Sequence, residues 1–175
     1  EMISLVLSEK YSTLKTQGNL NNEIGLPKTL FNLNSEHKAA VIEMGMSGFE
    51  EIARMTAAVR PDVAVISNIG VSHIEMLGSR EGILRAKLEI LDGMKSDAPI
   101  ILNGDDDMLV TVRPGAHPVK YYGIQNEKNN VKAFDITSKE NEIAMSVDFG
   151  GGTGRVSLPF PGRHNIYNAL CAVSA

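Results

Sequence analysis

Apolar residues follow two different spacings in the first two thirds of the chain. Short, continuously apolar segments alternate with segments in which apolar residues recur every three or four positions. The continuous runs predict strands buried on both faces, and the three-to-four spacing predicts helices. The predicted strands cover residues 38–45, 62–67 and 98–103, together with the more polar segment 11–16. The predicted helices cover residues 1–9, 23–33, 49–58, 79–94 and 105–112. This alternation indicates an α/β fold with a mostly parallel sheet that is flanked by helices.

The pattern changes at about residue 117, where apolar positions begin to alternate with polar ones in steps of two. The alternating apolar positions are Phe134, Ile136, Ile143, Met145, Val147, Phe149, Val156, Leu158 and Phe160. The segments SKENE (138–142) and GGGTG (150–154) lie between them and have the composition of turns. A period of two predicts an antiparallel β meander near the C-terminus. A final helix is predicted from about Arg163 to the end of the chain.

Lys87 has an unusual position in the predicted helix 79–94. At about 100° per residue the apolar residues of this helix fall on one broad face, and Lys87 points at its middle. Arg80 leans toward the same face, whereas the other charged residues point elsewhere. The apolar face comprises Ile83, Leu84, Leu88, Ile90, Leu91 and Met94, and the charges that point elsewhere are Glu81, Arg85, Glu89 and Asp92. A lysine in such a place either carries its amine to water or has a chemical use.

Composition narrows the classes of protein to which the chain can belong. Its 175 residues are 43% hydrophobic and 22% charged, as expected for one globular domain with a core. The net charge of −4 and the scattered basic residues give no electrostatic basis for binding nucleic acid. No apolar run reaches the ~18 residues of a membrane span, and the first residues do not resemble a signal peptide. The single cysteine, Cys171, cannot form an internal disulfide, so we expect a cytoplasmic protein.

Three polar residues are candidates for chemistry because they follow predicted strands. Glu43 ends the strand 38–45, His73 follows the strand 62–67, and Lys87 lies one short helix further on. Ligands of open parallel sheets gather at the carboxyl ends of strands. Each residue alone has an ordinary interpretation, as a cap, a loop histidine or a lysine that reaches to water. Their joint placement favours a functional site.

Two further segments are better explained as structure. GGGTG has the glycine content of a phosphate loop but lacks the G-x-x-x-x-G-K-[ST] spacing, so we interpret it as a turn. The run DDD (105–107) could bind a cation, but acidic residues that open a helix are stabilised by its dipole. We therefore favour a helix cap at this run.

The segment GNLNNEIGLP (18–27) places three asparagines before a predicted helix: Asn19, Asn21 and Asn22. Amide groups near a helix N-terminus suit phosphate or a polar substrate. They equally suit a turn that caps the helix. The residues alone leave both interpretations open.

Five segments resemble the central domain of the Mur ligases in their order and spacing. They are GNLNNEIGLPKTL, AVIEMGMSGFEEI, SNIGVSHIEMLGSREGILRAKLEI, ILNGDDD and PGRHNIYNALCA. The resemblance covers nearly the whole chain and implies a P-loop NTPase-like α/β fold. The asparagine-rich segment is most similar to the members that add D-alanyl-D-alanine to UDP-N-acetylmuramoyl-tripeptide. These two substrates imply a step in peptidoglycan precursor synthesis.

The resemblance also implies a reaction, its cofactors and its residues. In this family ATP phosphorylates a carboxylate, and an amine then attacks the acyl phosphate to give an amide, ADP and phosphate. By resemblance, Glu43 and His73 match binding positions for Mg²⁺, and Lys87 matches a lysine that carbon dioxide converts into a carbamate. Two more groups match nucleotide or substrate positions: His164, Asn165 and Asn168 at the segment that contacts adenine, and Asn19, Asn21 and Asn22 in a loop near the phosphates and the substrate.

Parts of the family pattern do not occur in the 175 residues. The P-loop is expected immediately before the first helix, and the N-terminal UDP-binding domain and the C-terminal domain are expected outside residues 1–175. We therefore expect a truncated central domain that is inactive alone. Loss of an inner strand would expose sheet edges, so we also expect self-association or marginal stability.

Two alternatives remain at the level of sequence. One is a Mur-type ligase that adds a different amino acid, and GNLNNEIGLP is the feature against it. The other is a non-catalytic nucleotide-binding module. A module without catalysis need not retain Glu43, His73 and Lys87 together.

Overall fold

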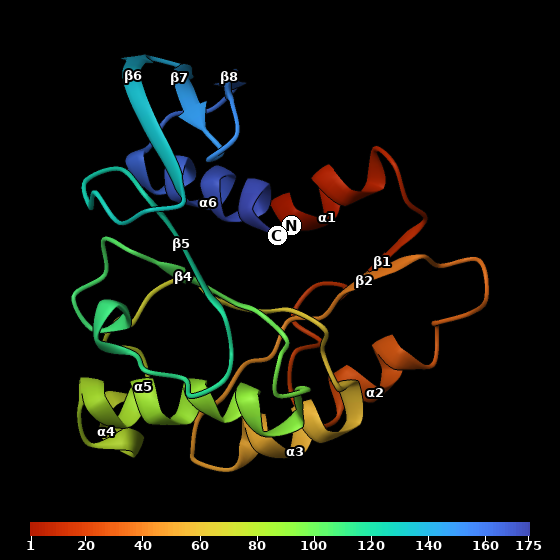
Figure 1. Cartoon of the computed structure of the whole chain (residues 1–175). Helices are drawn as coiled ribbons and strands as arrows, with labels where there is room; N and C mark the ends of the chain where they lie inside the picture. Colours follow the sequence, from red (N-terminus) through yellow and green to blue (C-terminus); the bar gives the residue numbers. More distant parts are fainter.

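A computed structural model describes residues 1–175 as a small parallel sheet and a larger mixed sheet, whose parallel strands lie between two layers of helices (Figure 1). The larger sheet has six strands, of which the first four are parallel and the last two antiparallel. In spatial order they are β3 (Ala64–Ile66), β4 (Ile100–Asn103), β5 (Val119–Gly123), β6 (Val131–Lys139), β7 (Glu142–Asp148) and β8 (Thr153–Leu158). The predicted α/β class and the predicted meander are both confirmed. The meander begins later than predicted, because β5 pairs in parallel with β4 and β6.

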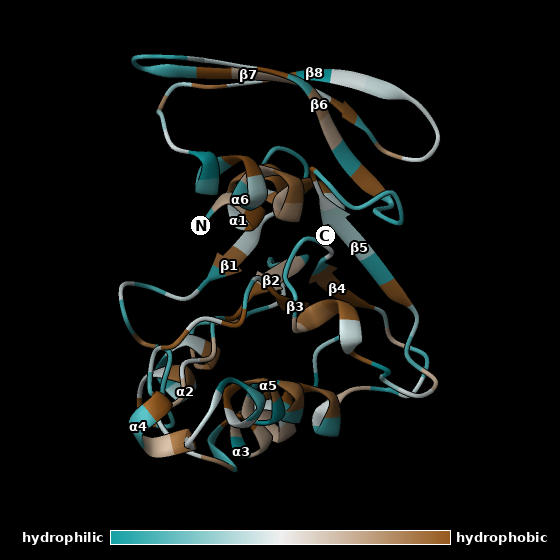
Figure 2. Ribbon diagram, turned by 90° about the vertical axis from the view of Figure 1, so that its left-hand side faces the viewer, coloured by the Kyte–Doolittle hydropathy of each residue, from teal (hydrophilic) through white to brown (hydrophobic).

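The smaller sheet consists of β1 (Thr13–Lys15) and β2 (Ala39–Val41), which pair in parallel. In both views it lies on the β3 side of the larger sheet (Figures 1 and 2). The sequence predicts a parallel sheet that lacks an inner strand, and in the structure β2 and β3 are not paired with each other. The small sheet is joined to the rest by α1 (Met2–Ser8), which contacts β1, β2 and the C-terminal helix.

The remaining helices confirm most of the predicted ones and correct two. They are α2 (Gly25–Leu30), α3 (Glu51–Val59), α4 (Ile74–Leu77), α5 (Arg80–Leu88) and α6 (Arg163–Ser174), with 3-10 turns η1 (Glu89–Gly93) and η2 (Leu109–Thr111). The predicted helix 79–94 is α-helical only to Leu88 and then tightens into η1. The predicted helix 105–112 is wrong. Only η2 forms there, because Asp106 holds the backbone in a turn.

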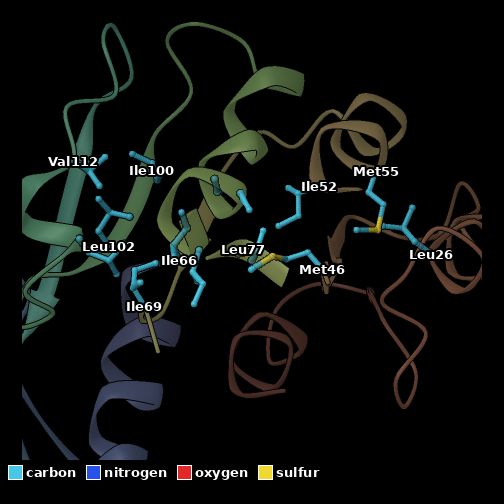
Figure 3. Packing of buried hydrophobic residues seen from close by; sticks show 14 residues of the cluster. Leu26, Met46, Ile52, Met55, Ile66, Ile69, Leu77, Ile100, Leu102 and Val112 are labelled. Carbon is cyan, nitrogen blue, oxygen red and sulfur yellow. The ribbon is translucent and has the colours of Figure 1, made fainter. Parts of the chain in front are cut away.

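Two hydrophobic clusters lie on opposite faces of the large sheet, and β4 contributes to both. Ile100 and Leu102 belong to the cluster under α2, α3 and α5 that Figure 3 shows, whereas Ile101 faces the cluster under α6. Figure 2 shows hydrophobic colours on these central strands and hydrophilic colours on the loops that connect them. A strand that is buried on both faces needs a continuous apolar run, which explains the pattern of residues 98–103. None of the helices combines the length and the apolar character that crossing a lipid bilayer requires.

Candidate active site

The candidate residues lie in loops that follow the parallel strands. Glu43 follows β2, His73 and Asn68 lie in the loop after β3, and residues 104–108 follow β4. Parallel strands present these loops at one edge of the sheet, where open α/β proteins bind ligands. The predicted location of the site is therefore consistent with the topology.

Glu43 is held by the asparagine-rich loop. The Asn21 side chain donates from Nδ2 to Glu43 Oε1 at 2.8 Å, and the Asn21 carbonyl accepts from the Gly45 amide at 2.7 Å. The backbone amide of Glu43 donates to the Thr16 hydroxyl at 2.9 Å. Glu43 itself is exposed, and its Oε2 has no hydrogen-bond partner within the chain. One carboxylate oxygen is therefore fixed and the other is available.

The other two asparagines of this loop have different environments. Asn22 Oδ1 accepts from the backbone amides of Ile24 at 3.1 Å and Gly25 at 2.7 Å, so it caps the start of α2. Asn19 is exposed, and its side chain makes no hydrogen bond within the chain. The turn-with-cap interpretation is correct for Asn22. A role for Asn19 toward phosphate or substrate stays a prediction.

Lys87 extends from α5 to the loop after β3. Its Nζ donates to the Asn68 carbonyl at 2.8 Å, and the side chain is half-buried. Burial lowers the pKa of the Lys87 amine below its usual value, and the negative charge of Asp106 opposes part of that effect. Lys87 therefore contacts the loop that carries His73, although it does not point straight into the apolar core.

His73 has a strained backbone at the start of α4. Its φ of 63° lies in the left-handed region, which a side chain with a Cβ rarely adopts. The imidazole is exposed and makes no hydrogen bond within the chain. Strain of this kind persists only where the surroundings enforce it, and it is concentrated at functional sites.

The acidic run 105–107 helps to hold the loop after β3 in its conformation. Asp106 Oδ2 accepts from the Ile69 amide at 2.9 Å, and Asp106 Oδ1 accepts from the amides of Met108 and Leu109. Asp107 binds the Arg80 guanidinium through both oxygens, at 2.6 and 2.8 Å. The run therefore binds backbone amides and an arginine, and the helix cap predicted here does not form, because no α-helix follows the run.

Asp105 has a structural role that the sequence does not reveal. Its carboxylate accepts from the backbone amides of Ile124, Gln125 and Asn126 and from the Tyr167 hydroxyl at 3.0 Å. Burial raises the pKa of the Asp105 carboxyl, but these hydrogen bonds outweigh burial and hold the pKa below the usual value. Asp105 thereby joins the loop after β4, the loop after β5 and the helix α6.

Glu89 is a second residue that sequence reasoning missed. Its two oxygens accept from the backbone amides of Glu50 at 2.8 Å and Ala53 at 3.3 Å, at the N-terminus of α3. The sequence predicts only that Glu89 points away from the middle of the apolar face, and it does not reveal this contact. A helical projection places Glu89 beside the apolar face, but it cannot show that the start of α3 packs there.

The predicted adenine-binding residues lie together in the first two turns of α6. Asn165 Nδ2 donates to the Pro161 carbonyl at 2.7 Å, and Asn168 Nδ2 donates to Asn165 Oδ1 at 3.4 Å. His164 is exposed beside Gly162, whose φ of 105° and proximity to the imidazole leave no room for a Cβ. Contact between this group of residues and the adenine base stays a prediction.

The next question is whether the side chains of Glu43 and His73 suit the expected magnesium ion. No three His, Cys, Asp or Glu side chains of the described residues 1–175 lie together as a metal site. Glu43 offers one free carboxylate oxygen, and His73 has a free imidazole. Mg²⁺ is usually bound through one or two carboxylates together with substrate phosphates and water. The residues fit a magnesium ion that a nucleotide helps to bind, and they do not fit a cage made by the protein alone.

Comparison with known proteins decides the family. The Mur ligase middle domain model matches residues 1–175. The chain belongs to the Mur ligase middle domain family. The predicted resemblance is thereby confirmed. The roles of Glu43, His73, Lys87 and the asparagines stay predictions.

Named relatives of the family are similar over the whole chain. A UDP-N-acetylmuramoyl-tripeptide–D-alanyl-D-alanine ligase from Bacillus subtilis is 39% identical over 175 residues, which are 100% of this chain and 37% of the relative. The enzyme of the same name from Escherichia coli is 35% identical, over 99% of this chain and 39% of the relative. The chain thus spans less than two fifths of the relatives that it matches.

Solved structures agree with the family assignment. MurF from Acinetobacter baumannii superposes with a TM-score of 0.92 at 36% identity, over 99% of this chain and 38% of that one. MurF from Thermotoga maritima in complex with ADP superposes with a TM-score of 0.88 at 28% identity, over 99% of this chain and 40% of that one. The α/β fold with its C-terminal meander is therefore a fold of this family.

Proposed function

We propose that this chain is the central, nucleotide-binding part of an ATP-dependent ligase. The proposed enzyme joins D-alanyl-D-alanine to UDP-N-acetylmuramoyl-tripeptide in peptidoglycan precursor synthesis. The observation that carries the proposal is the match of the whole chain, at 39% identity, to a ligase with that name. ATP and the UDP-linked substrate are cytoplasmic metabolites, so the reaction is proposed for the cytoplasm.

The proposed reaction has two bond-forming steps. A carboxylate oxygen of the tripeptide attacks the γ-phosphorus of ATP, and ADP leaves. The amine of D-alanyl-D-alanine then attacks the acyl carbon, inorganic phosphate leaves, and the amine loses a proton. Both steps concentrate negative charge on phosphoryl oxygens, so positive charge placed there lowers the barrier.

Residues of this chain are proposed to hold the cation and the nucleotide. Glu43 supplies a carboxylate oxygen, His73 an imidazole, and Lys87, once converted into a carbamate, two further oxygens. A bound Mg²⁺ would supply the positive charge over the phosphoryl group. Lowering of the Lys87 pKa by burial supports carbamate formation, because only the neutral amine adds carbon dioxide.

The N-terminal part of α6 is proposed to contact the base. His164, Asn165 and Asn168 share this end of the helix, where side-chain amides can both donate and accept hydrogen bonds. Asp105 positions α6 through Tyr167, so the proposed base site and the β4 loop are coupled in the fold. Asn19 is proposed to contact phosphate or substrate from the asparagine-rich loop.

The proposed enzyme contains domains outside residues 1–175. A P-loop strand, a domain for the UDP end and a domain for the incoming dipeptide are proposed, since the 175 residues cover 37% of the Bacillus subtilis relative. The separation of the β1–β2 sheet from β3 supports an additional strand between them, because it would complete a single parallel sheet.

The test is a ligation assay with the complete protein, ATP and magnesium. Release of phosphate should require both UDP-N-acetylmuramoyl-tripeptide and D-alanyl-D-alanine, and mass spectrometry should detect the pentapeptide product. Turnover with a different amino acid and not with D-alanyl-D-alanine would favour another Mur-type ligase. Nucleotide binding without any ligation would favour a non-catalytic module.

A further inference from the structure

We propose that Asn21 is a positioning residue that orients the Glu43 carboxylate for the cation. This inference rests on the proposed function. It adds a residue that orients the proposed metal ligand Glu43 and does not itself touch the reacting atoms. Asn21 lies in the loop after β1 and Glu43 in the loop after β2. The two residues are 22 positions apart in the sequence, and the fold brings their side chains together.

The Asn21 side chain is itself held in place. The backbone carbonyl of Asn21 accepts from the Gly45 amide at 2.7 Å, so the backbone of the asparagine loop is fixed to the strand end that carries Glu43. A Cβ added at Gly45 would lie 3.0 Å from Cγ and Nδ2 of Asn21, so the amide packs flat against this glycine. Asn21 is half-buried, whereas Glu43 is exposed. The amide is therefore the ordered partner, and it restricts an otherwise mobile carboxylate.

The hydrogen bond engages only one of the two oxygens of the Glu43 carboxylate. Nδ2 of Asn21 donates to Oε1 at 2.8 Å, and Oε2 has no partner within the chain. Metal-binding carboxylates are commonly oriented by hydrogen bonds from residues outside the coordination shell, and removing such a partner costs about 10–100-fold in metal affinity or activity. An amide is neutral, so it orients the carboxylate without adding a positive charge that would compete with the cation.

Neither helix capping nor backbone strain accounts for an asparagine at position 21. The cap of α2 is provided by Asn22, so Asn21 is not needed for it. The backbone of Asn21 does not adopt the left-handed conformation that favours asparagine, since the residues with positive φ lie elsewhere in the chain. The only side-chain hydrogen bond of Asn21 is the one to Glu43, so the contact with this carboxylate is the structural reason for the amide.

The experiment measures cation binding directly in the complete protein. Electron paramagnetic resonance would follow Mn²⁺ binding in the presence of a non-hydrolysable ATP analogue, for the wild type, Asn21→Ala and Asn21→Leu. Leucine keeps the bulk that packs on Gly45 and removes the donor, so it covers the case in which alanine fails to fold. Both variants should bind Mn²⁺ about 10-fold more weakly.

The matched control is Asn32→Ala, because Asn32 also donates from Nδ2, to the Lys28 carbonyl at 3.0 Å, and is exposed beyond α2. This control should leave Mn²⁺ binding unchanged. A cycle with Glu43→Gln separates positioning from a general structural effect. If Asn21 acts through Glu43, Asn21→Leu should cause no further loss of Mn²⁺ affinity in the Glu43→Gln background.

Three results would overturn the inference: normal Mn²⁺ affinity in both Asn21 variants, losses that multiply with that of Glu43→Gln, or no effect of Glu43→Gln itself. The inference and the proposed reaction can fail separately. A complete protein that binds Mn²⁺ through the Asn21–Glu43 pair but does not ligate D-alanyl-D-alanine would retain the first and reject the second.

Discussion

Lys87 shows how one half-buried side chain can connect a helix to a functional loop. Its amine leaves the apolar side of α5 and donates to the Asn68 carbonyl, five residues before His73. The hydrogen bond gives the amine a polar partner, while burial lowers its pKa. The proposed conversion of this amine into a carbamate would place an anionic group beside the β3 loop. The contact with the loop supplies a structural reason for a lysine at a position where the helical pattern favours leucine.

We predict that Lys87→Ala lowers turnover of the complete enzyme by ~100-fold or more, as expected for the loss of a group that stabilises charge in the transition state. Steady-state assays at saturating ATP would measure the change. Bicarbonate should not restore activity, whereas a short-chain carboxylate could replace the carbamate oxygens. Turnover within a few-fold of the wild type would reject the proposed role of Lys87.

Asp105 provides a second prediction at the scale of one residue. Asp105→Asn keeps the shape of the side chain but replaces one acceptor oxygen by a donor that faces backbone amides. We expect a loss of about 2 kcal/mol in the free energy of unfolding at pH 7, typical of a hydrogen bond to a charged group. Chemical denaturation of both proteins would measure it.

The same pair of proteins should differ in its dependence on pH. The pKa of Asp105 is lowered in the folded state, so the unfolded state binds more protons as the pH falls. The contribution of Asp105 is fully present above the ordinary aspartate pKa of about 3.9 and is lost as the pH falls through the lower folded value. The difference in stability between wild type and Asp105→Asn should therefore shrink in acid. A difference that grows in acid would contradict this assignment.

At the scale of elements, α5 and η1 organise the loops on both sides of them. Arg80 contacts the Ile69 carbonyl and Asp107, Lys87 contacts Asn68, and Glu89 contacts the start of α3. Arg85 lies over the ring of Phe49, with its guanidinium carbon 4.5 Å from the ring centre. One helical segment thus fixes the loop after β3 and the segment that leads from Glu43 into α3.

We predict that Glu89→Ala destabilises the protein by about 1 kcal/mol, because the amides of Glu50 and Ala53 lose a charged acceptor at a helix N-terminus. Asp92→Ala is the matched control, since Asp92 is an exposed acid of the same segment with no hydrogen bond in the chain. Thermal unfolding of both variants would separate the two effects. Equal shifts in Tm would argue against the cap.

At the scale of the whole molecule, the most distinctive feature is a sheet in two pieces. The small sheet has only three paired residues in each strand, and β2 and β3 do not pair with each other. Unpaired strand edges can pair with another chain. Packing of α1 on β1, β2 and α6 connects the small sheet to the rest.

We predict that residues 1–175 expressed alone self-associate or unfold with low cooperativity. Light scattering across a range of concentrations and calorimetry would measure these properties. Ala40→Lys, at an exposed position of β2, should reduce association, because lysine on an edge strand opposes pairing. A sharp melting transition from a concentration-independent monomer would be the contrary result.

We also predict no ATP-dependent ligation by residues 1–175 alone, because this segment contains no G-x-x-x-x-G-K-[ST] sequence to hold the phosphates. Phosphate release with tripeptide substrate, D-alanyl-D-alanine, ATP and magnesium would measure it, with the complete protein as the positive control. Turnover by the isolated segment would contradict the prediction.

The sequence by itself determined the class of fold and most of its elements. Continuous apolar runs predicted β2 to β4, and the period of two predicted the meander, because these patterns record which faces of a strand are buried. Placement after predicted strands made Glu43, His73 and Lys87 candidates, and the family motifs gave each of them a predicted role. The local helix at 105–112 was predicted wrongly, because the acidic run binds distant backbone amides in place of opening a helix.

Only the tertiary structure decided which polar groups meet. Asn21 reaches Glu43 across 22 positions, Glu89 reaches Glu50 across 39, and Tyr167 reaches Asp105 across 62. Periodicity reports burial within one element, and it carries no information about the partner that a side chain finds on another. These contacts form because the packing of α3, α5 and α6 on the sheets brings loops together, and each buried or half-buried polar group then requires a hydrogen-bond partner.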